Sequence, residues 1–482
     1  MTDRRFAGGL AVAAAAVGLL YLRFHAPWLD ELQAWALVRA SPSPAALWAN
    51  IGPEAHPPLW YVLLAFVQLV SLDPAAMAVF HAALATSAIW ILGRHAPFHP
   101  LVRILIACSV FVLVEYFAVA RGYVLVELLT FAACAELGGR RRPWVLAILL
   151  SLLAQAEVHG AVLGGGLCAA WLLSERERAP AARLSAPVLA GSALWALSAA
   201  LCLWELGRRL RLPAPPTSMF LPIPAPPEWQ LGLTGTLRWL VPPVSAGLKL
   251  WTRWFPALSP LPIAAGAAIG LFVALTLSLR RSRPALACWL LSGLPLLAAL
   301  HFARGEPRHV GMIFLAFVAS LWIAGPALQP APRSKAAALV TLFLAQQAIS
   351  GAILFVRELG HPRSASTATA RYLRAERLQD LPFVCDRDDA TVSVLGLLDR
   401  GCFFPSIGAD SRFVRWGPGR SRVGPGDLAA ASSRLLESSP LVVLLLNHRL
   451  EAPPRGVGLR AAFEEASMGS EKFYVYEARK VP

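Results

Sequence analysis

Eleven apolar runs constrain the fold of this chain more than any other feature. Most are 16 to 22 residues long, about the length of helix that crosses the hydrocarbon core of a bilayer. Charged residues make up only 15% of the 482 residues, whereas a soluble protein carries about a quarter. The sequence therefore predicts a polytopic α-helical membrane protein. The predicted spans are residues 6–22, 74–93, 101–117, 124–139, 144–157, 161–174, 185–203, 259–279, 284–300, 309–325 and 335–356.

Arginines between the apolar runs predict the orientation. With a cytoplasmic N-terminus, every inside loop is basic, as the positive-inside rule requires. The run at 59–72 is only about 14 residues long, and counting it as a span would move the arginine clusters outside, so it is expected to be an interfacial helix of the first outer loop. Since the loops account for the net charge of +15, no nucleic-acid partner is expected. Richness in Ala, Leu, Arg and Pro is typical of a high-GC bacterial genome, and the expected location is the bacterial inner membrane.

The C-terminal tail differs in composition from the rest of the chain. We expect residues 1–356 to form the membrane domain and residues 357–482 a small extracytoplasmic α/β domain, because helix-like and strand-like segments alternate there. Outside the cytoplasm, Cys385 and Cys402 can form a disulfide, with two unpaired thiols as the alternative. The predicted tail helices are "SASTATARYLRAERL" and "GDLAAASSRLLES", and the predicted strands are "LPFVCD", "PLVVLLLN" and "KFYVYEA".

Two acids and a histidine stand in the first outer loop, close to the membrane. Asp30 and Glu31 follow the first span by about eight residues, and Asp30 is a candidate base or merely the cap of a helix. His56 precedes Pro57-Pro58, which hold it extended and present its side chain at a fixed place. An ordinary proline turn before the interfacial helix is the alternative for His56.

A short outer turn, "EYFAVARGYVLVELL", carries an arginine where topology does not require a cation. The guanidinium of Arg121 offers a planar fork of donors that matches a phosphate group. Glu115 ends the preceding span and Tyr123 begins the next. Snorkelling of Arg121 to lipid headgroups is the alternative.

Two further outer turns carry ionisable residues. "QAEVHGA" places Glu157 and His159 on the outer face, and "HFARGEPRHVG" adds Arg304, Arg308 and His309. Arginines on the side where positive charge is depleted require an anionic partner, although each can also belong to a structural ion pair. Acids, histidines and arginines from separate loops thus map to one membrane face, where ionisable groups are functional candidates. They favour group transfer from a lipid phosphate, and the absence of nucleotide-binding motifs argues against a nucleotide-dependent reaction.

The motifs "WLDELQAW", "HPPLWYVLL", "YFAVARGYVLVELL" and "EVHG" resemble those of the C-type glycosyltransferase superfamily. The resemblance is strongest to bacterial relatives of protein O-mannosyltransferases and aminoarabinose transferases, and it covers roughly residues 6–175. It implies a polyprenyl-phosphate-linked sugar as donor, transfer on the extracytoplasmic face, and a lipid, glycan or protein acceptor.

The resemblance also implies roles for individual residues. Asp30 matches the first-loop acid that activates the acceptor hydroxyl, and Glu31 is its neighbour in the motif. His56 matches a position near the donor phosphate, while Arg121 and Tyr123 match a turn whose arginine suits phosphate. Arg304 and Arg308 are further candidates for the same phosphate.

The remaining candidates are Glu115, Glu157, His159 and His309, of which His159 matches the histidine of the family's next outer turn. Val119 departs from the family, because relatives often have glutamate there and Glu115 is out of register. The resemblance therefore provides no second acid as a metal ligand, and a divalent metal is left open with no other cofactor expected.

The sequence leaves three functions in competition. With Asp30 as base and arginines offsetting the phosphate charge, a transferase would act by a single inverting displacement. A transporter or flippase of lipid-linked sugars would use the same arginines but is expected to carry charges deep within broken spans. A non-catalytic component of envelope-polysaccharide assembly is the third reading, which Val119 leaves open.

Overall fold

The computed structural model describes residues 3–54, 56–210, 261–303, 307–325, 335–416, 421 and 423–480. These residues divide into two compact units. The first unit contains residues 3–21, 80–206 and the described residues from 261 to 357. The second contains residues 22–79, 207–210 and the described residues from 358 onward, so the first loop groups with the tail.

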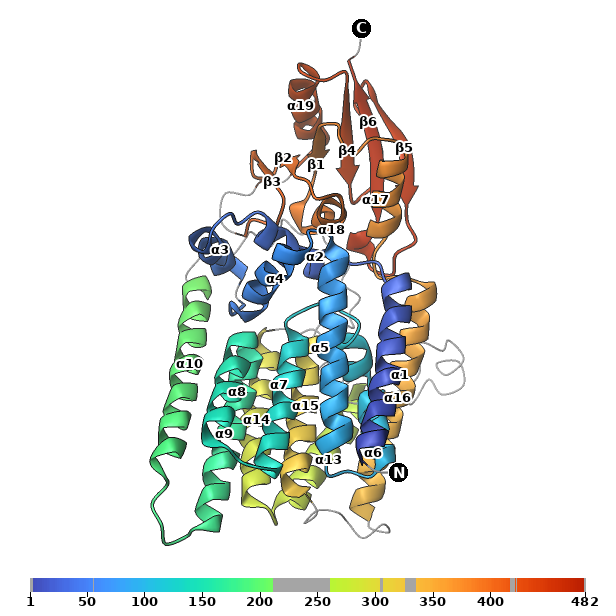
Figure 1. Cartoon of the computed structure of the whole chain (residues 1–482). Coiled ribbons are helices and arrows are strands. Elements are labelled where there is room, and N and C mark those ends of the chain that lie inside the picture. Colours follow the sequence, from blue (N-terminus) through green and yellow to red (C-terminus); the bar gives the residue numbers. More distant parts are fainter. Residues whose placement is uncertain are drawn as a thin grey trace. The chain divides into compact units, whose positions relative to one another are not determined.

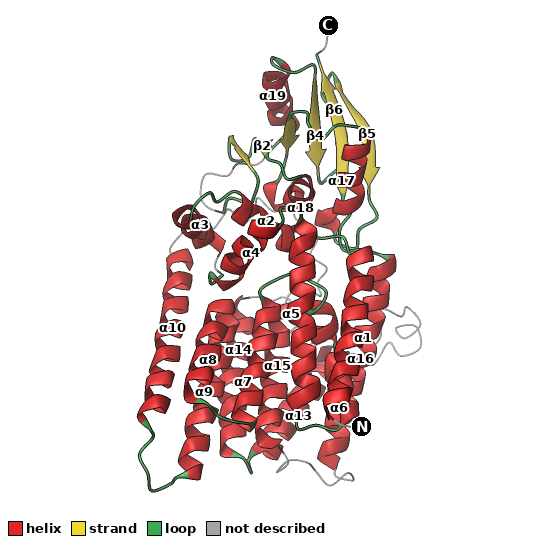
Figure 2. Ribbon diagram, viewed as in Figure 1, coloured by secondary structure: helices red, strands yellow, loops and turns green. Residues whose placement is uncertain are grey.

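The first unit is built from helices (Figures 1 and 2). The predicted apolar runs are mainly helical where the structure describes them, apart from a break within 101–117, and six described helices (α1, α5, α10, α14, α15, α16) are long and apolar enough to cross a membrane. The count of eleven spans stays a prediction. The helices are α1 (Asp3–Phe24), α5 (Pro74–His95), α6 (Pro100–Ala107), η2 (Val110–Tyr116), α7 (Tyr123–Gly138), α8 (Pro143–Ala156), α9 (Val158–Arg178), α10 (Ala186–Leu210), α13 (Leu261–Leu279), α14 (Arg283–Ala303), α15 (Pro307–Ala324) and α16 (Lys335–Gly360).

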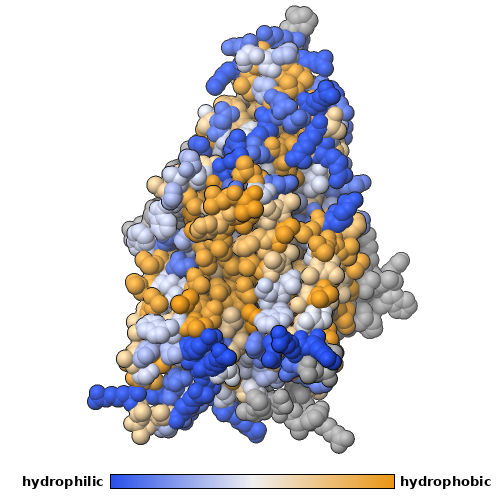
Figure 3. Space-filling model, viewed as in Figure 1, coloured by the Kyte–Doolittle hydropathy of each residue, from blue (hydrophilic) through white to orange (hydrophobic). Residues whose placement is uncertain are grey.

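Hydropathy divides the surface of the helical unit into zones. Figure 3 shows a broad apolar surface over its helices and hydrophilic side chains at the end where the N-terminus and the α9–α10 loop lie. That loop carries Arg178 and Arg183 after the last turn of α9. An apolar surface bordered by basic loops is what a bilayer requires of a spanning bundle.

The continuous helix predicted for residues 101–117 is wrong. The helix α6 ends at Ala107, Ser109 adopts an extended backbone conformation (φ −63°, ψ 156°), and the π-helix η2 follows. The hydroxyl of Ser109 accepts a bond from the amide of Val112. A Cβ atom on Gly351 of α16 would lie 2.3 Å from the carbonyl oxygen of Cys108, so the missing side chain lets α16 pack directly against the break.

In the second unit, the first loop forms α2 (Leu29–Arg39), α3 (Pro44–Ile51), η1 (Gly52–Glu54) and α4 (Leu59–Val70). The helix α4 confirms that the short apolar run at 59–72 is helical. Its C-terminal residues Leu69 and Val70 are 82% and 89% exposed, which suits a helix that lies on a membrane surface. Its interfacial position stays a prediction.

The tail forms a six-stranded mixed sheet in the order β3-β2-β1-β4-β6-β5, which confirms the predicted α/β domain. The strand β1 pairs in parallel with β2 and β4, and the other pairs are antiparallel. The sequence did not predict β2, β3, β5 or α18. The elements are α17 (Ser366–Ala375), β1 (Phe383–Cys385), α18 (Asp388–Leu398), β2 (Cys402–Phe404), β3 (Ala409–Ser411), α19 (Pro425–Leu436), β4 (Leu441–Leu446), β5 (Val457–Phe463), η8 (Gly469–Glu471) and β6 (Phe473–Arg479).

Both faces of this sheet are covered, as the apolar sequence of β4 requires. Val443 and Leu445 pack in the core that contains residues of α17 and α18. Val442 and Leu444 point to the opposite face and pack with residues of α19. Since successive side chains of a strand alternate between faces, a run of six apolar residues marks a central strand buried on both sides.

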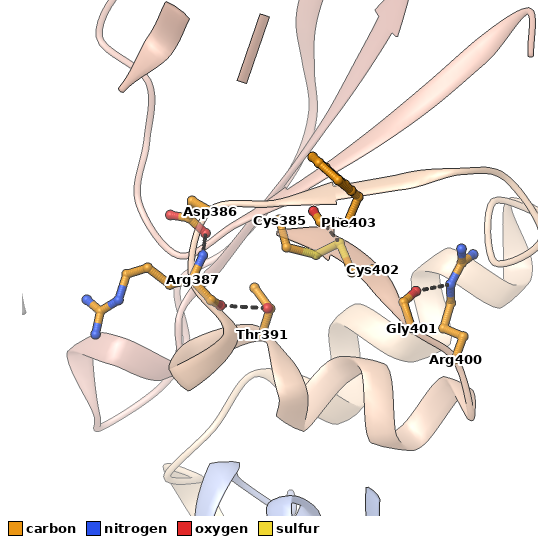
Figure 4. The surroundings of a disulfide bond; sticks show 8 residues. All are labelled: Cys385, Asp386, Arg387, Thr391, Arg400, Gly401, Cys402 and Phe403. Carbon is orange, nitrogen blue, oxygen red and sulfur yellow. Dashed lines mark hydrogen bonds between the residues drawn. A yellow bond between two sulfur atoms is a disulfide. The ribbon is translucent and has the colours of Figure 1, made fainter. Parts of the chain in front are cut away.

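Cys385 and Cys402 form a disulfide that joins the neighbouring strands β1 and β2 (Figure 4). The two cysteines are 17 positions apart and both are buried. Of the two alternatives that the sequence left open, the structure has the disulfide.

Replacing both cysteines by alanine is expected to destabilise the tail by about 3 kcal/mol, because the closed loop no longer restricts the unfolded chain. The measurement is limited proteolysis of the full chain in detergent at rising temperature. A reducing agent should lower the temperature at which the tail is cleaved in the wild type and have no effect on the double variant. Equal responses of the two proteins would contradict a stabilising disulfide.

Candidate functional site

Glu31 is a structural residue of the first turn of α2. Its side chain is almost fully buried, and its carboxylate oxygen Oε1 accepts bonds from the backbone amide of Trp28 at 3.2 Å and from His25 Nε2 at 2.7 Å. The first bond caps α2, because an acid at the third helical position reaches back to the residue that precedes the helix. These contacts account for the burial of Glu31 without a catalytic role.

His25 joins two buried carboxylates. Its second ring nitrogen, Nδ1, lies 3.5 Å from an oxygen of Glu358, and Glu358 pairs in turn with Arg363 at 3.2 Å. Burial lowers the pKa of His25, but the carboxylates of Glu31 and Glu358 outweigh burial and raise it from 6.5 to about 9. The histidine is therefore a cation at neutral pH and balances the charge of the two acids.

A third carboxylate caps α2 from the tail. Glu471 of η8 accepts a bond from the backbone amide of Leu29 at 3.1 Å and bonds from the hydroxyls of Ser364 and Ser393 at 2.6 and 2.9 Å. Burial raises the pKa of Glu471 to about 7, although these three bonds act in the opposite direction, and the nearby charge of Asp30 adds to the rise. No sequence motif points to Glu471, because η8 is a short turn far along the chain from α2.

Asp30 differs from its neighbour Glu31 in its surroundings. It lies in the first turn of α2 and stays partly exposed, whereas Glu31 is only 1% exposed. His56 is also partly exposed, in the turn between η1 and α4, where Pro58 begins the helix. Adjacent positions on a helix point in different directions, which explains why one acid is buried and the other is partly exposed.

In the first unit, Tyr123 gathers several of the predicted site residues. Its hydroxyl hydrogen-bonds to His309 Nε2 at 2.8 Å, and the rings of His309 and His159 stack with centroids 4.9 Å apart. The guanidinium carbons of Arg121 and Arg308 lie 5.7 and 5.8 Å from the centre of the Tyr123 ring. We call Arg121, Tyr123, His159, Arg308 and His309 the tyrosine cluster.

Helix N-termini supply these side chains. Tyr123 is the first residue of α7, His159 the second of α9, and Arg308 and His309 the second and third of α15. Tyr116 holds the arrangement, since its hydroxyl donates to the carbonyl of Arg308 at 2.8 Å and its ring stacks on Tyr123. Helix N-termini and guanidinium groups both favour negative charge, so the cluster is suited to an anion.

Two acidic candidates lie near the tyrosine cluster. Glu115 and Glu157 are buried, the first in η2 and the second at the residue that precedes α9, and their charges act on Tyr116, whose ring stacks on Tyr123. Arg304 lies outside the described residues. Among the residues that the structure describes, no three His, Cys, Asp or Glu side chains gather as a metal site, so no residue is assigned to a metal.

Glu127 is a buried residue that the sequence reasoning did not single out. It is 1% exposed and lies four residues, about one helical turn, after Tyr123 in α7. An acid inside an apolar run was the signal available, because buried acids in membrane helices are functional candidates.

Comparison with solved structures places the fold. The chain resembles the crystal structure of ArnT from Cupriavidus metallidurans bound to undecaprenyl phosphate, with a TM-score of 0.51, 11% identity and 97% of each chain covered. The apo structure of the same protein matches with the same TM-score and identity over 98% of each chain. These matches confirm a polytopic membrane fold with a small C-terminal sheet domain, as the apolar runs and the composition of the tail predicted.

Comparison by sequence adds nothing to this. No family model matches the chain, and no curated protein matches it. At this identity, the structural likeness shows the fold and leaves the activity to be argued from the residues.

The second unit is expected to lose stability as the pH rises. The folded pKa of His25, about 9, lies above its ordinary 6.5, so its stabilisation is complete below pH 6.5 and is lost as the pH rises through 9, by roughly 3 kcal/mol. The folded pKa of Glu471 is likewise raised, from 4.5 to about 7, so its contribution is lost as the pH rises through 7.

The measurement is thermal unfolding of the full chain in detergent across this pH range, for the wild type, His25→Gln and His361→Gln. His25→Gln should flatten the decline between pH 6.5 and 9, whereas the exposed His361 should have no influence. An unchanged pH profile in His25→Gln would show that this ion pair does not control the stability.

Proposed function

We propose that this protein is a glycosyltransferase that moves a sugar from a polyprenyl-phosphate donor to an acceptor. The observation that carries the proposal is the tyrosine cluster, which includes Arg121, two residues before α7, and Arg308, the second residue of α15, in a fold like that of ArnT bound to undecaprenyl phosphate. The sequence motifs that resemble aminoarabinose transferases support the same reading, since ArnT is an aminoarabinose transferase.

The tyrosine cluster is the proposed binding site of the donor phosphate. Arg121 and Arg308 bring two positive charges to one tyrosine ring, and the three helix N-termini add their dipoles. A polyprenyl phosphate is the leaving group of the reaction, and its charge grows as the sugar departs. Cations that stabilise this growing charge accelerate the reaction.

Asp30 is the proposed general base. It takes the proton of the acceptor hydroxyl while the hydroxyl oxygen forms a bond to the anomeric carbon of the sugar. The bond between that carbon and the phosphate oxygen breaks in the same step, and the electron pair leaves with the polyprenyl phosphate. A single displacement of this kind inverts the configuration of the sugar.

The remaining partners follow from the proposed reaction. The donor is a membrane lipid, so the protein is placed in the bacterial inner membrane with an extracytoplasmic tail, as the arginine distribution favours. The acceptor is a lipid, a glycan or a protein with a free hydroxyl. His56 is assigned to the donor phosphate only by the resemblance of its motif.

Asp30→Asn is expected to abolish transfer and leave folding intact, because the amide cannot accept the proton and has the same shape as the half-buried carboxylate that it replaces. The measurement is the movement of radiolabel from polyprenyl-phosphate sugars to acceptors in membranes. Asp380→Asn, an exposed aspartate of the tail, is the matched control and should retain activity. Equal transfer by wild type and Asp30→Asn would exclude Asp30 as base, and donor bound but never consumed by either would indicate a carrier.

Arg121→Gln and Arg308→Gln are each expected to weaken donor binding about 10- to 100-fold, since a hydrogen bond to a charged group contributes about 1.5–3 kcal/mol. The measurement is equilibrium binding of radiolabelled polyprenyl phosphate to the protein in nanodiscs. Arg176→Gln removes an exposed arginine at the other end of α9 and should bind normally. An equal loss of donor binding in all three variants would show that the net charge of the protein, rather than the tyrosine cluster, controls binding.

A further inference from the structure

The second unit contains a pocket of about 700 Å³ that the proposed reaction does not use. One wall comes from the first loop, where Ala40 ends α2 and Asn50 lies in α3. The other wall comes from the tail, with Arg412, Arg415 and Trp416 after β3. We call it the loop–tail pocket.

Hydrogen bonds of a buried side-chain amide hold the two walls of the pocket together. Gln33 of α2 donates to the carbonyl of Val414 at 3.2 Å, and its side-chain oxygen accepts from the amide of Val414 at 2.7 Å. Glu54 accepts from both Gln33 and the indole of Trp416, at 2.7 and 3.1 Å. Ala36, Val392 and Val414 pack behind these bonds. The pocket is therefore pre-formed, and a ligand need not order it on binding.

The charged residues that line the pocket are two arginines, Arg412 and Arg415, and one aspartate, Asp410. The guanidinium of Arg39 donates two hydrogen bonds of 3.1 Å to the carboxylate of Asp399. The guanidinium of Arg412 donates to the carboxylate and to the backbone carbonyl of Asp399, also at 3.1 Å. One carboxylate thus fixes two guanidinium groups. Arg415 is exposed, and no described residue bonds to its side chain, because only its backbone amide is engaged, by Asp388 at 3.1 Å. Asp410 is the one acid among the described lining residues.

Aromatic and amide side chains complete the lining. Phe413 and Trp416 are partly exposed, and the indole orientation is fixed by Glu54. The amide nitrogen of Asn50 donates to Ser41 at 2.9 Å, which fixes the amide plane. Sugars present apolar faces that stack on aromatic rings and hydroxyl edges that bond to amides and guanidinium groups, so this combination suits a sugar that carries a negative charge.

We infer that the loop–tail pocket binds an anionic sugar unit of the acceptor, one that bears a phosphate or a carboxylate. The inference rests on the proposed function, for which it names the class of acceptor. Ala40 follows Asp30 by ten residues, which places the pocket about 15 Å along α2 from the proposed base. The pocket thus holds a part of the acceptor that is distant from the reacting hydroxyl.

The test measures the binding of glucose 6-phosphate and of glucuronate to the full chain in nanodiscs. Saturation-transfer NMR of the sugar protons reports the binding. Both anionic sugars are expected to bind at least tenfold more tightly than glucose. Arg415→Gln should weaken their binding at least tenfold, since it removes a charged hydrogen bond but not the backbone contact. Arg371→Gln, which changes an exposed arginine of α17, is the matched control and should bind like the wild type.

Further arms separate this pocket from the alternatives. Inorganic phosphate that competes as well as glucose 6-phosphate would overturn the inference in favour of a bare anion site. Binding that survives Arg415→Gln but is lost in Arg121→Gln would assign the sugars to the donor site and overturn it as well, as would no saturable binding. Because binding is read without transfer, Asp30→Asn should bind normally, and the result stands whether or not the chain proves to be a transferase.

Discussion

The buried first turn of α2 is the constraint on which the second unit depends. Glu31 and Glu471 both cap this turn, and the charge of Asp30, which belongs to the same turn, acts on Glu471. A helix N-terminus favours negative charge, but burial of several carboxylates is costly unless a cation is near. His25 supplies that cation to Glu31 and also contacts Glu358 at the end of α16. One histidine thereby fixes the start of the helix that carries the proposed base.

In the first unit, two arginines with the same charge lie near one tyrosine ring. Arg121 and Arg308 approach the same ring, and the aromatic face of Tyr123 attracts each of them. Tyr116 fixes the ring by stacking and fixes α15 through the carbonyl of Arg308. A Cβ atom on Gly311 would lie 2.2 Å from the Tyr116 hydroxyl, so glycine is required one turn into α15. The cations are thus placed before any anion arrives, which is the condition for efficient charge stabilisation.

Features that repeat along the chain were predictable from the sequence, whereas those that depend on distant packing were not. The apolar runs predicted the helices because a bilayer fixes their length, and "PLVVLLLN" predicted β4 because it is buried on both faces. The break in the helix at Ser109 could not be predicted from the neighbouring residues, because it accompanies the close approach of Gly351 on α16, which is distant in the sequence. Glu471 caps α2 from 442 positions away, and only the fold brings them together. Asp30 and Glu31 looked equivalent in the sequence, and burial separated them.

The helix α2 connects the proposed general base at its first turn with the loop–tail pocket at its other end. Its first turn carries Asp30, and its last residue, Arg39, is bound by the same Asp399 that fixes Arg412 at the pocket. The helix is buried along most of its length and packs on α18, so its two ends cannot move independently. The proposed base and the wall of the loop–tail pocket formed by Ala40 are therefore held by one rigid helix.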